Sequence, residues 1–314
     1  MKKNIYSSFV LISIFILVIN IFTKSSRLTN IIIFSINLFT KNIFPSLFPM
    51  FIISSLLVEI GVPEFLGSLF KKVFDILFKA NSTSSFVFFM SMLTGFPSSA
   101  KFIDDLMNKK IINEQDAEKI LKFTFFSNPL FIINTIGINF LGNIKIGILI
   151  LIAHVLGNII TGILFRSTNT NYKNLDYNFT IKQLIDKTSN TDLFRVILSS
   201  IKNALDIMIN IFGIVTFILI FINMIFKYPN SYLEIFITGI IEMTTGLKYL
   251  ALSNISLNLK IITSTFFISF GGFSVHAQIM NILKEKKVKY LPFLKARIIH
   301  GLISTILIIT LSFH

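Results

Sequence analysis

The chain has 314 residues, of which 53% belong to the hydrophobic set and only 14% are charged, with a mean hydropathy of +0.77. Soluble domains carry about 25% charged residues, so this composition excludes a water-soluble enzyme. The net charge of +14 comes from an excess of lysines and arginines. We interpret these residues as loop charges that orient membrane helices, not as a nucleic-acid-binding surface. Because one crossing takes about 20 apolar residues, the sequence predicts an all-α, polytopic protein in the lipid bilayer with about seven transmembrane helices.

Several classes of active site are excluded by missing residues. The chain has no cysteine, which excludes disulfides, thiol catalysis and cysteine metal sites. Its four histidines form no HExxH pair, and it contains neither a GxSxG elbow nor a GxxxxGK[ST] phosphate loop. We therefore expect no enzyme, no bound metal and no cofactor.

The N-terminal elements follow from apolar runs and the charges between them. Two lysines at the start precede a run that is longer than a signal-peptide core and lacks a clean cleavage site, so we expect it to be retained. In chain order the sequence predicts a first helix over 5–22, an interfacial helix over 25–42, a crossing over 43–60 and an amphipathic surface helix over 62–80.

Helix-breaking residues interrupt the next apolar segments. Residues 84–107 are broken by Thr94-Gly95-Phe96-Pro97-Ser98-Ser99 into two arms of about ten residues, each too short to cross alone, which favours a re-entrant hairpin. The stretch 119–140 is interrupted at Ser127-Asn128-Pro129, and 143–165 reads as a plain crossing. The first half is therefore predicted to combine one hairpin with one broken helix.

The second half repeats this order. A polar linker over 166–195 precedes a crossing over 197–226, a short apolar segment over 232–253 that is broken at Thr244-Thr245-Gly246, a helix over 258–283 that is broken at Gly271-Gly272, and a last helix over 291–313. An odd number of crossings separates equivalent elements, so the two repeats are expected to be inverted. With a cytoplasmic N-terminus, most basic residues fall on the cytoplasmic side.

These elements define four predicted parts. Their boundaries are 1–40 for the N-terminal helix and interfacial segment, 41–165 for the first repeat, 166–196 for the cytoplasmic linker and 197–314 for the second repeat.

A helix broken inside the membrane exposes polar backbone groups, so such breaks usually line a cavity. The new half-helix N-termini carry about half a positive charge and suit a carboxylate or phosphate. In the first half the candidate binding residues are Gly95, Pro97, Ser98, Ser99, Lys101, Ser127, Asn128 and Pro129.

The second half supplies more polar residues and two acids. The candidate binding residues there are Glu242, Thr244, Thr245, Gly246, Gly271, Gly272, Ser274, His276 and Gln278. Asn203, Asp206 and Asn210 recur at helical spacing, and we expect their shared face to look into the bundle. Because an acid inside the membrane usually marks an ion or substrate path, Asp206 and Glu242 are the candidates for coupling to a proton or cation.

Several motifs resemble a known family. These are FVFFMSMLTGFPSSAK from residue 86, SNPLF from 127, GIIEMTTG from 239, FGGFSVHAQ from 270 and PFLKAR from 292. They resemble the YlbJ-type sporulation integral membrane proteins, which carry two nucleoside-recognition, or Gate, domains and are similar in design to concentrative nucleoside transporters. The resemblance implies transport of dipicolinic acid across the outer forespore membrane of a sporulating bacterium.

Carried onto this chain, the family's motifs fall on the candidate binding residues given above, and they imply a small anionic solute as the ligand. Two other functions stay open. A nucleoside or cation permease would depend on Glu242 and Asp206, and a non-transporting membrane scaffold for sporulation would need the breaks only for folding. The coupling ion, the direction of flux and the oligomeric state do not follow from the sequence.

Overall fold

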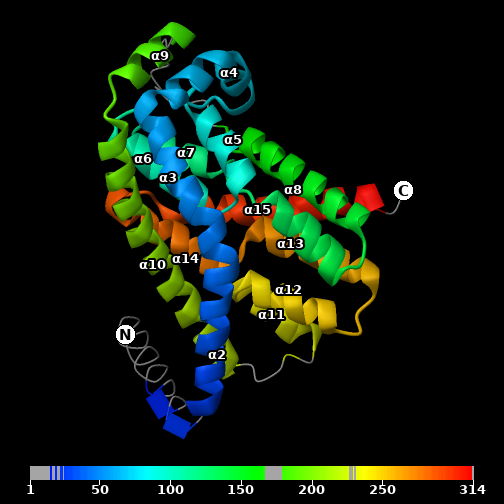
Figure 1. Ribbon diagram of the computed structural model, residues 1–314. Helices are drawn as coiled ribbons and strands as arrows, with labels where there is room; N and C mark the ends of the chain where they lie inside the picture. The colour runs from blue at the N-terminus through cyan, green and yellow to red at the C-terminus, as the bar shows by residue number, and fades with distance from the viewer. Residues whose placement is uncertain are drawn as a thin grey trace, which may run out of the picture.

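The computed structural model describes residues 15, 18, 19, 22, 23, 25–166, 179–225, 229 and 231–312 (Figure 1). Every regular element in these residues is a helix, so the predicted all-α class is confirmed. The first helix predicted over 5–22 lies mostly outside the described residues.

A long helical rod opens the described chain (Figure 1). It consists of α2 (Ser25–Leu38), the π-helical turn η1 (Phe39–Ile43) and α3 (Phe44–Ile60). Both junction residues, Leu38 and Phe44, have right-handed helical backbone angles, so the segments predicted as an interfacial helix and a crossing run on as one rod. Gly61, with φ of +93°, ends the rod, and α4 (Val62–Phe78) leaves at 78° to α3.

The rest of the first half contains both predicted interruptions. Its elements are α5 (Ser84–Thr94), α6 (Ser98–Asn108), α7 (Glu114–Leu121), the π-helix η2 (Phe131–Phe140) and α8 (Ile144–Leu164). The break between α5 and α6 falls where the glycine and proline predict it. The second break is longer than expected, because residues 124–128 have no helical structure before the chain turns helical again at Pro129.

The second half also contains a hairpin and a broken helix. Its elements are α9 (Ile181–Ser189), α10 (Leu193–Ile225), α11 (Tyr232–Ile241), α12 (Met243–Leu252), α13 (Leu257–Phe270), α14 (Gly272–Ile282), the short η3 (Lys284–Lys286) and α15 (Tyr290–Ser312). The break between α13 and α14 falls at the predicted glycines. The hairpin break falls at Glu242, so the prediction of a break at Thr244-Thr245-Gly246 is wrong by two to four residues.

Three unbroken helices in the described chain are long and apolar enough to cross a membrane, namely α8, α10 from Leu193 to Asn223, and α15. A fourth span results if the bent pair α3 and α4 is counted as one. Shorter apolar helices are α5, η2 and α11. The total of seven crossings therefore stays a prediction, since it requires the interrupted segments to cross as well.

Two antiparallel helix pairs organise the molecule. Asn158 of α8 lies beside Arg297 of α15, and His154, one turn earlier on α8, lies beside His300, one turn later on α15. The rod of α2 and α3 packs on α10 in the same antiparallel sense. In the first part of the rod, Thr216 donates to Ser35 at 3.0 Å, and at its end Glu59 lines one cavity with Arg195 from the start of α10.

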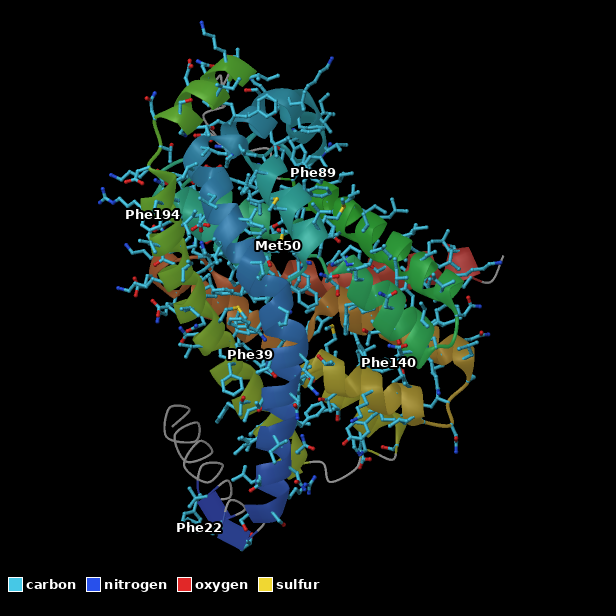
Figure 2. All side chains as sticks on the ribbon, in the orientation of Figure 1. Phe22, Phe39, Met50, Phe89, Phe140 and Phe194 are labelled. Atoms are coloured by element: carbon cyan, nitrogen blue, oxygen red, sulfur yellow. The ribbon has the colours of Figure 1, made fainter. Side chains whose placement is uncertain are left out.

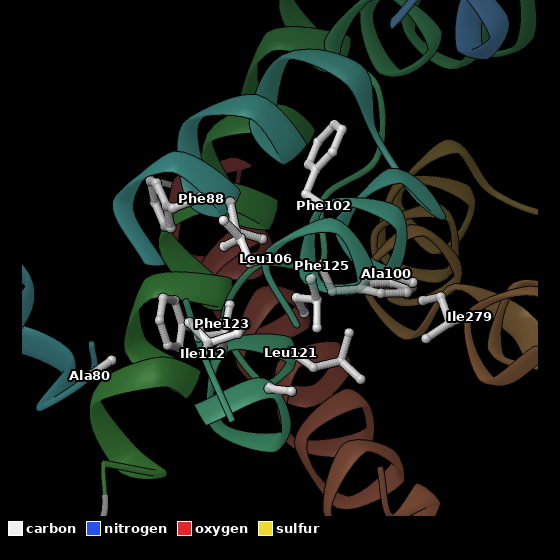
Figure 3. Close-up of a cluster of buried hydrophobic side chains, with 14 of the residues drawn as sticks. Ala80, Phe88, Ala100, Phe102, Leu106, Ile112, Leu121, Phe123, Phe125 and Ile279 are labelled. Atoms are coloured by element: carbon white, nitrogen blue, oxygen red, sulfur yellow. The ribbon is translucent and has the colours of Figure 1, made fainter. Parts of the chain in front are cut away.

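The outer surface is rich in apolar side chains, as lipid contact requires. Phe22 is 82% exposed and Phe194 is 72% exposed, and Figure 2 shows both at the edge of the molecule. The core is equally aromatic. Figure 3 shows Phe88, Phe102, Phe123 and Phe125 in the buried cluster that joins α5, α6 and the segment after α7.

Candidate functional site

The tip of the first hairpin packs directly on the first broken helix. Gly95 has φ of +82°, and a β-carbon there would lie 2.5 Å from the Asn128 backbone nitrogen, so only glycine fits. The Phe96 amide donates to the Phe126 carbonyl at 2.6 Å, and the Asn128 side chain donates to the Thr94 carbonyl at 3.3 Å. The structure therefore brings together Gly95 and Asn128, two of the residues predicted to form the site.

Buried side chains satisfy the polar backbone of the unwound segment, which we define as residues 122–128. Asn158 of α8 donates from its side-chain nitrogen to the carbonyls of Phe123 at 3.1 Å and Phe125 at 3.0 Å. An unpaired backbone group away from water costs several kcal/mol, so this asparagine makes the non-helical segment tolerable inside the protein.

Two further side chains complete the support of the unwound segment. The Ser127 amide donates to Nε2 of His154 at 3.0 Å, and Nη2 of Arg297 donates to the Lys122 carbonyl. Nδ1 of His154 lies 3.0 Å from Oγ of Ser269, on the second broken helix. His154 therefore connects the broken helices of the two halves.

Asn128 caps the start of η2. Oδ1 of Asn128 accepts from the amides of Leu130 at 2.8 Å and Phe131 at 3.4 Å, and Pro129 stands where no amide donor is needed. The N-terminus of this half-helix is thus occupied by a side chain of the protein itself.

The second hairpin and the second broken helix also touch each other. A β-carbon on Gly272, whose φ is +70°, would lie 3.1 Å from the Met243 amide nitrogen and 3.3 Å from the Gly239 carbonyl oxygen. The Glu242 carboxylate accepts from the amides of Thr244 at 3.1 Å and Thr245 at 2.6 Å. The start of α12 therefore already holds an anion that belongs to the chain.

Phe125 fills the space where the two halves meet. Its ring stacks on Phe96 of the first hairpin tip, with centroids 4.7 Å apart. A β-carbon on Gly271 would lie 2.2 Å from the tip of the same ring. The ring also lies edge-on to His276 and beneath the guanidinium of Arg297, whose Cζ is 4.6 Å from its centroid.

Arg297 and His300 lie at the same junction. Nη1 of Arg297 lies 3.0 Å from Nδ1 of His300, and both residues are fully buried. Nε2 of His300 lies 2.9 Å from the His154 carbonyl oxygen, which can only accept, so this nitrogen carries the proton and Nδ1 accepts from the arginine. His300 is therefore neutral, and the positive charge resides on Arg297.

The other first-half candidates divide into two groups. The hydroxyls of Ser98 and Ser99 at the start of α6 are fully buried without a hydrogen-bond partner in the described structure. Lys101 instead forms a buried ion pair with Asp105, and its Nζ donates to Oγ of Ser55 at 3.0 Å. Its charge is therefore compensated within the protein.

The remaining second-half candidates are mostly buried and in contact with the protein. His276 lies between the Phe270 carbonyl at 2.8 Å and the Tyr290 hydroxyl at 3.1 Å. Gln278 donates to Ser274 at 3.5 Å. Gly246 packs on Gly239 of the other hairpin arm, where a β-carbon would meet the backbone at 2.2 Å.

The expectation that the polar face of α10 looks into the bundle is wrong. Asn203, Asp206 and Asn210 are all exposed. The apolar stripe of α10 packs against the rod instead, because its residues can bury more apolar area. The buried residues of this stripe include Ala204, Met208, Ile211 and Val215.

One cavity lies away from the breaks. It has a volume of about 490 Å³ and lies between α3, α6 and the start of α10, with Ser55, Asp105 and Asn203 in its lining. In the described residues no group of three or more histidines and acids is placed to hold a metal ion.

Sequence reasoning missed Asn158, Arg297 and His300 as parts of this junction. A signal was present, since Phe293, Arg297, His300 and Ser304 recur at helical spacing on one face of the last predicted helix. That spacing places a charged side chain on the buried face.

Comparison with known proteins gives one curated relative. The chain is 27% identical over 303 residues to the sporulation integral membrane protein YlbJ of Bacillus subtilis (strain 168), covering 86% of this chain and 74% of that protein. No family model matches the chain, and no solved structure matches it. With the hairpin and broken-helix motifs in the same chain, this similarity supports the resemblance of the chain to the YlbJ-type sporulation integral membrane proteins.

Proposed function

We propose that this integral membrane protein carries a small anionic solute, dipicolinate, across the outer forespore membrane during sporulation. The observation that supports the proposal is the meeting of both hairpin tips and both broken helices around one point. Phe96 and Phe125 come to it from the first half, and Gly271 comes from the second. Interrupted helices are kept inside membranes where they line a binding site or a path.

Two half-helix N-termini without a side-chain cap favour an anion over a cation. Glu242 caps α12 and Asn128 caps η2, but the ends of α6 and α14 have no side-chain cap. The two unpartnered hydroxyls of Ser98 and Ser99 stand at the open end of α6. A helix N-terminus that lacks a side-chain cap and has unpartnered hydroxyls beside it favours a negatively charged group.

The proposal includes an inverted repeat with about seven crossings. In it, the rod of α2 and α3 corresponds to α10, the pair α5 and α6 to α11 and α12, the first broken helix to α13 and α14, and α8 to α15. An inverted repeat relates its members by a two-fold axis in the membrane plane, so equivalent helices run antiparallel. The antiparallel packing of α8 on α15 and of the rod on α10 supports this assignment.

Coupling to a proton or cation requires an acid that can bind the coupling ion at the site. Asp206 is exposed on α10, and Glu242 is engaged by two amides, so a coupling role for Glu242 requires it to leave its cap. A nucleoside or cation permease would depend on that release, because no other acid lies at the breaks in the described chain.

The test is uptake of labelled dipicolinate into liposomes that contain the purified protein, measured against protein-free liposomes. Gly272→Ala, which pushes a methyl group toward the Met243 amide, should abolish uptake in a variant that circular dichroism shows to be folded. The matched control is Gly142→Ala, because Gly142 also has a positive φ but has open space around it.

Uptake by the wild type and the control, but not by Gly272→Ala, is the expected result. No dipicolinate uptake above protein-free liposomes would refute the proposal. Uptake of a nucleoside in its place would identify the permease function, and sporulation supported by a folded, flux-deficient variant would identify the scaffold.

A further inference from the structure

Arg297 is a fully buried cation whose partners in the described structure are all neutral. Nη1 contacts Nδ1 of His300, Nη2 donates to the Lys122 carbonyl, and Oδ1 of Asn158 accepts from both terminal nitrogens at 3.5 Å. Nε has no hydrogen-bond partner. No aspartate or glutamate of the described chain lies within ion-pairing distance of this side chain.

The neighbouring dipoles compensate this charge only in part. The Lys122 carbonyl stands at the C-terminus of α7, which supplies about half a negative charge. The two bonds to Asn158 are at the upper limit of hydrogen-bond length and are therefore weak. Burying an ion that lacks a full counter-charge is costly, so this position is unfavourable unless an anion binds there.

The other buried side-chain cations show how the protein normally treats such a charge. Lys101 is 1% exposed, and it pairs with Asp105 one turn later on the same helix. Lys119 is 6% exposed, and its Nζ donates to the Lys79 carbonyl, while Asp116 lies three residues earlier on the same helix. Arg297 differs from Lys101 because it takes part in none of the ion pairs of the described residues, and from Lys119 because its own helix carries no aspartate or glutamate.

The position of Arg297 directs its charge toward the meeting point of the breaks. Its guanidinium lies over the ring of Phe125 at 4.6 Å and over that of Phe293 at 5.4 Å. Phe125 belongs to the unwound segment, where no helical hydrogen bonds hold the backbone, and its ring separates the guanidinium from Phe96. When this ring moves aside, the guanidinium faces the space between the two halves.

A carboxylate is the ligand that best fits the guanidinium of Arg297 once the Phe125 ring has moved. The planar fork of a guanidinium donates two parallel hydrogen bonds to the two oxygens of a carboxylate, and such charge-assisted pairs are stronger than neutral ones. The aromatic rings of Phe96, Phe293 and His276 surround this space and suit a flat apolar body attached to the carboxylate.

We propose that Arg297 binds a carboxylate group of the transported solute, and that the Phe125 ring occupies the place of that solute in the closed state. The proposal deepens the function proposed above and rests on it for the identity of the solute. Arg297 is not among the binding residues predicted from the sequence.

The test measures carboxylate binding separately from transport. The full chain in lipid nanodiscs is titrated with sodium dipicolinate and with sodium benzoate, at constant ionic strength in chloride. Binding is followed by the rise in thermal unfolding midpoint, since a ligand at 100 times its Kd stabilises a protein by about 2.7 kcal/mol. The variants are Arg297→Gln and Arg297→Lys, with Lys295→Gln as the matched control, because Lys295 is an exposed cation on the same helix.

Loss of the charge-assisted pair should weaken carboxylate binding by about 10- to 100-fold in Arg297→Gln. Arg297→Lys, which keeps a cation but not the fork, should bind more weakly than the wild type, and Lys295→Gln should bind as the wild type does. If Arg297→Gln does not fold, ¹⁵N spectra of the wild type test the binding role of Arg297. The chain has only four arginines, so the Nε resonance of Arg297 can be assigned by substitution. The Nε resonance that is missing in Arg297→Lys should shift when dipicolinate or benzoate is added.

Two results overturn the inference. One is wild-type affinity for both carboxylates in folded Arg297→Gln, and the other is an unchanged Nε resonance at saturating ligand. A wild type that binds benzoate through Arg297 but takes up no dipicolinate would refute the proposed function and leave this inference standing. A wild type that carries dipicolinate, together with an Arg297→Gln that carries it with equal affinity, would refute only the inference.

Discussion

The contact between the two broken helices can be tested by adding one methyl group at Gly271. In the structure, a β-carbon at this position would lie 2.2 Å and 2.7 Å from two ring atoms of Phe125. In the closed state that ring is fully buried, with Phe96 stacked on it at 4.7 Å and Arg297 on it as well, so without solute it has no neighbouring space to move into.

Two terms contribute to the cost of Gly271→Ala. Placing a side chain at a φ of +88° costs about 1–2 kcal/mol, and overpacking a dense core costs about 1–3 kcal/mol more. Gly142→Ala carries only the first term, because its φ is +70° and nothing lies within 4 Å. Gly271→Ala should therefore lower the free energy of unfolding by about 1–3 kcal/mol more than Gly142→Ala does.

The assay is equilibrium unfolding in mixed micelles, followed by circular dichroism. A double-mutant cycle with Phe125→Ala isolates the contact, since Gly271→Ala should cost only about 1–2 kcal/mol once the ring is gone. Equal costs for Gly271→Ala and Gly142→Ala, or a coupling energy near zero in the cycle, would show that the two breaks do not meet.

Three further predictions concern buried polar groups. Asn158→Leu removes both hydrogen bonds from this side chain to the unwound segment, so it should lower the free energy of unfolding by about 2–5 kcal/mol. Asn143→Ala, at the exposed cap of α8, should lower it by about 1 kcal/mol, and equal losses would contradict the support role of Asn158. Lys101→Met leaves Asp105 without its ion-pair partner and should lower the free energy of unfolding by about 3–5 kcal/mol, whereas Lys109→Met, in a more exposed pair with Glu59, should lower it by under about 1 kcal/mol. Chemical denaturation of both variants measures the difference, and equal losses would contradict it. Glu242→Gln should lower stability by about 1 kcal/mol through the weakened cap of α12 and leave the pH dependence of dipicolinate uptake unchanged; a displaced pH profile would restore Glu242 as the coupling acid.

The breaks that local chemistry encodes were predictable from the sequence. Gly95 and Gly271 need positive φ, and Asn128 with Pro129 forms a cap that is visible in the residue types alone. The glycine at 246 misled the prediction, because it serves close packing of the two hairpin arms against Gly239 and not the break itself. The break lies at Glu242, whose carboxylate starts the next half-helix.

Features built from distant residues could not be predicted in this way. The unwound segment is longer than its Pro and Asn signals indicate, because Asn158 and Arg297 hold its carbonyls from other helices. The 3.6-residue spacing of Asp206 with its asparagine neighbours defines a face of α10 but not the direction in which that face points. Only the packing of the apolar stripe against α3 settles that direction, and it leaves Asp206 exposed.

The most direct test of the central claim, that interrupted helices of both halves form one solute site, is a cryo-electron microscopy map of the protein in nanodiscs with saturating dipicolinate. We predict broken helices at residues 95, 128, 242 and 271, a displaced Phe125 ring, and solute density between that ring and Arg297. Continuous helices through these positions, or solute density in the cavity between α3, α6 and α10 with Phe125 unmoved, would contradict that claim.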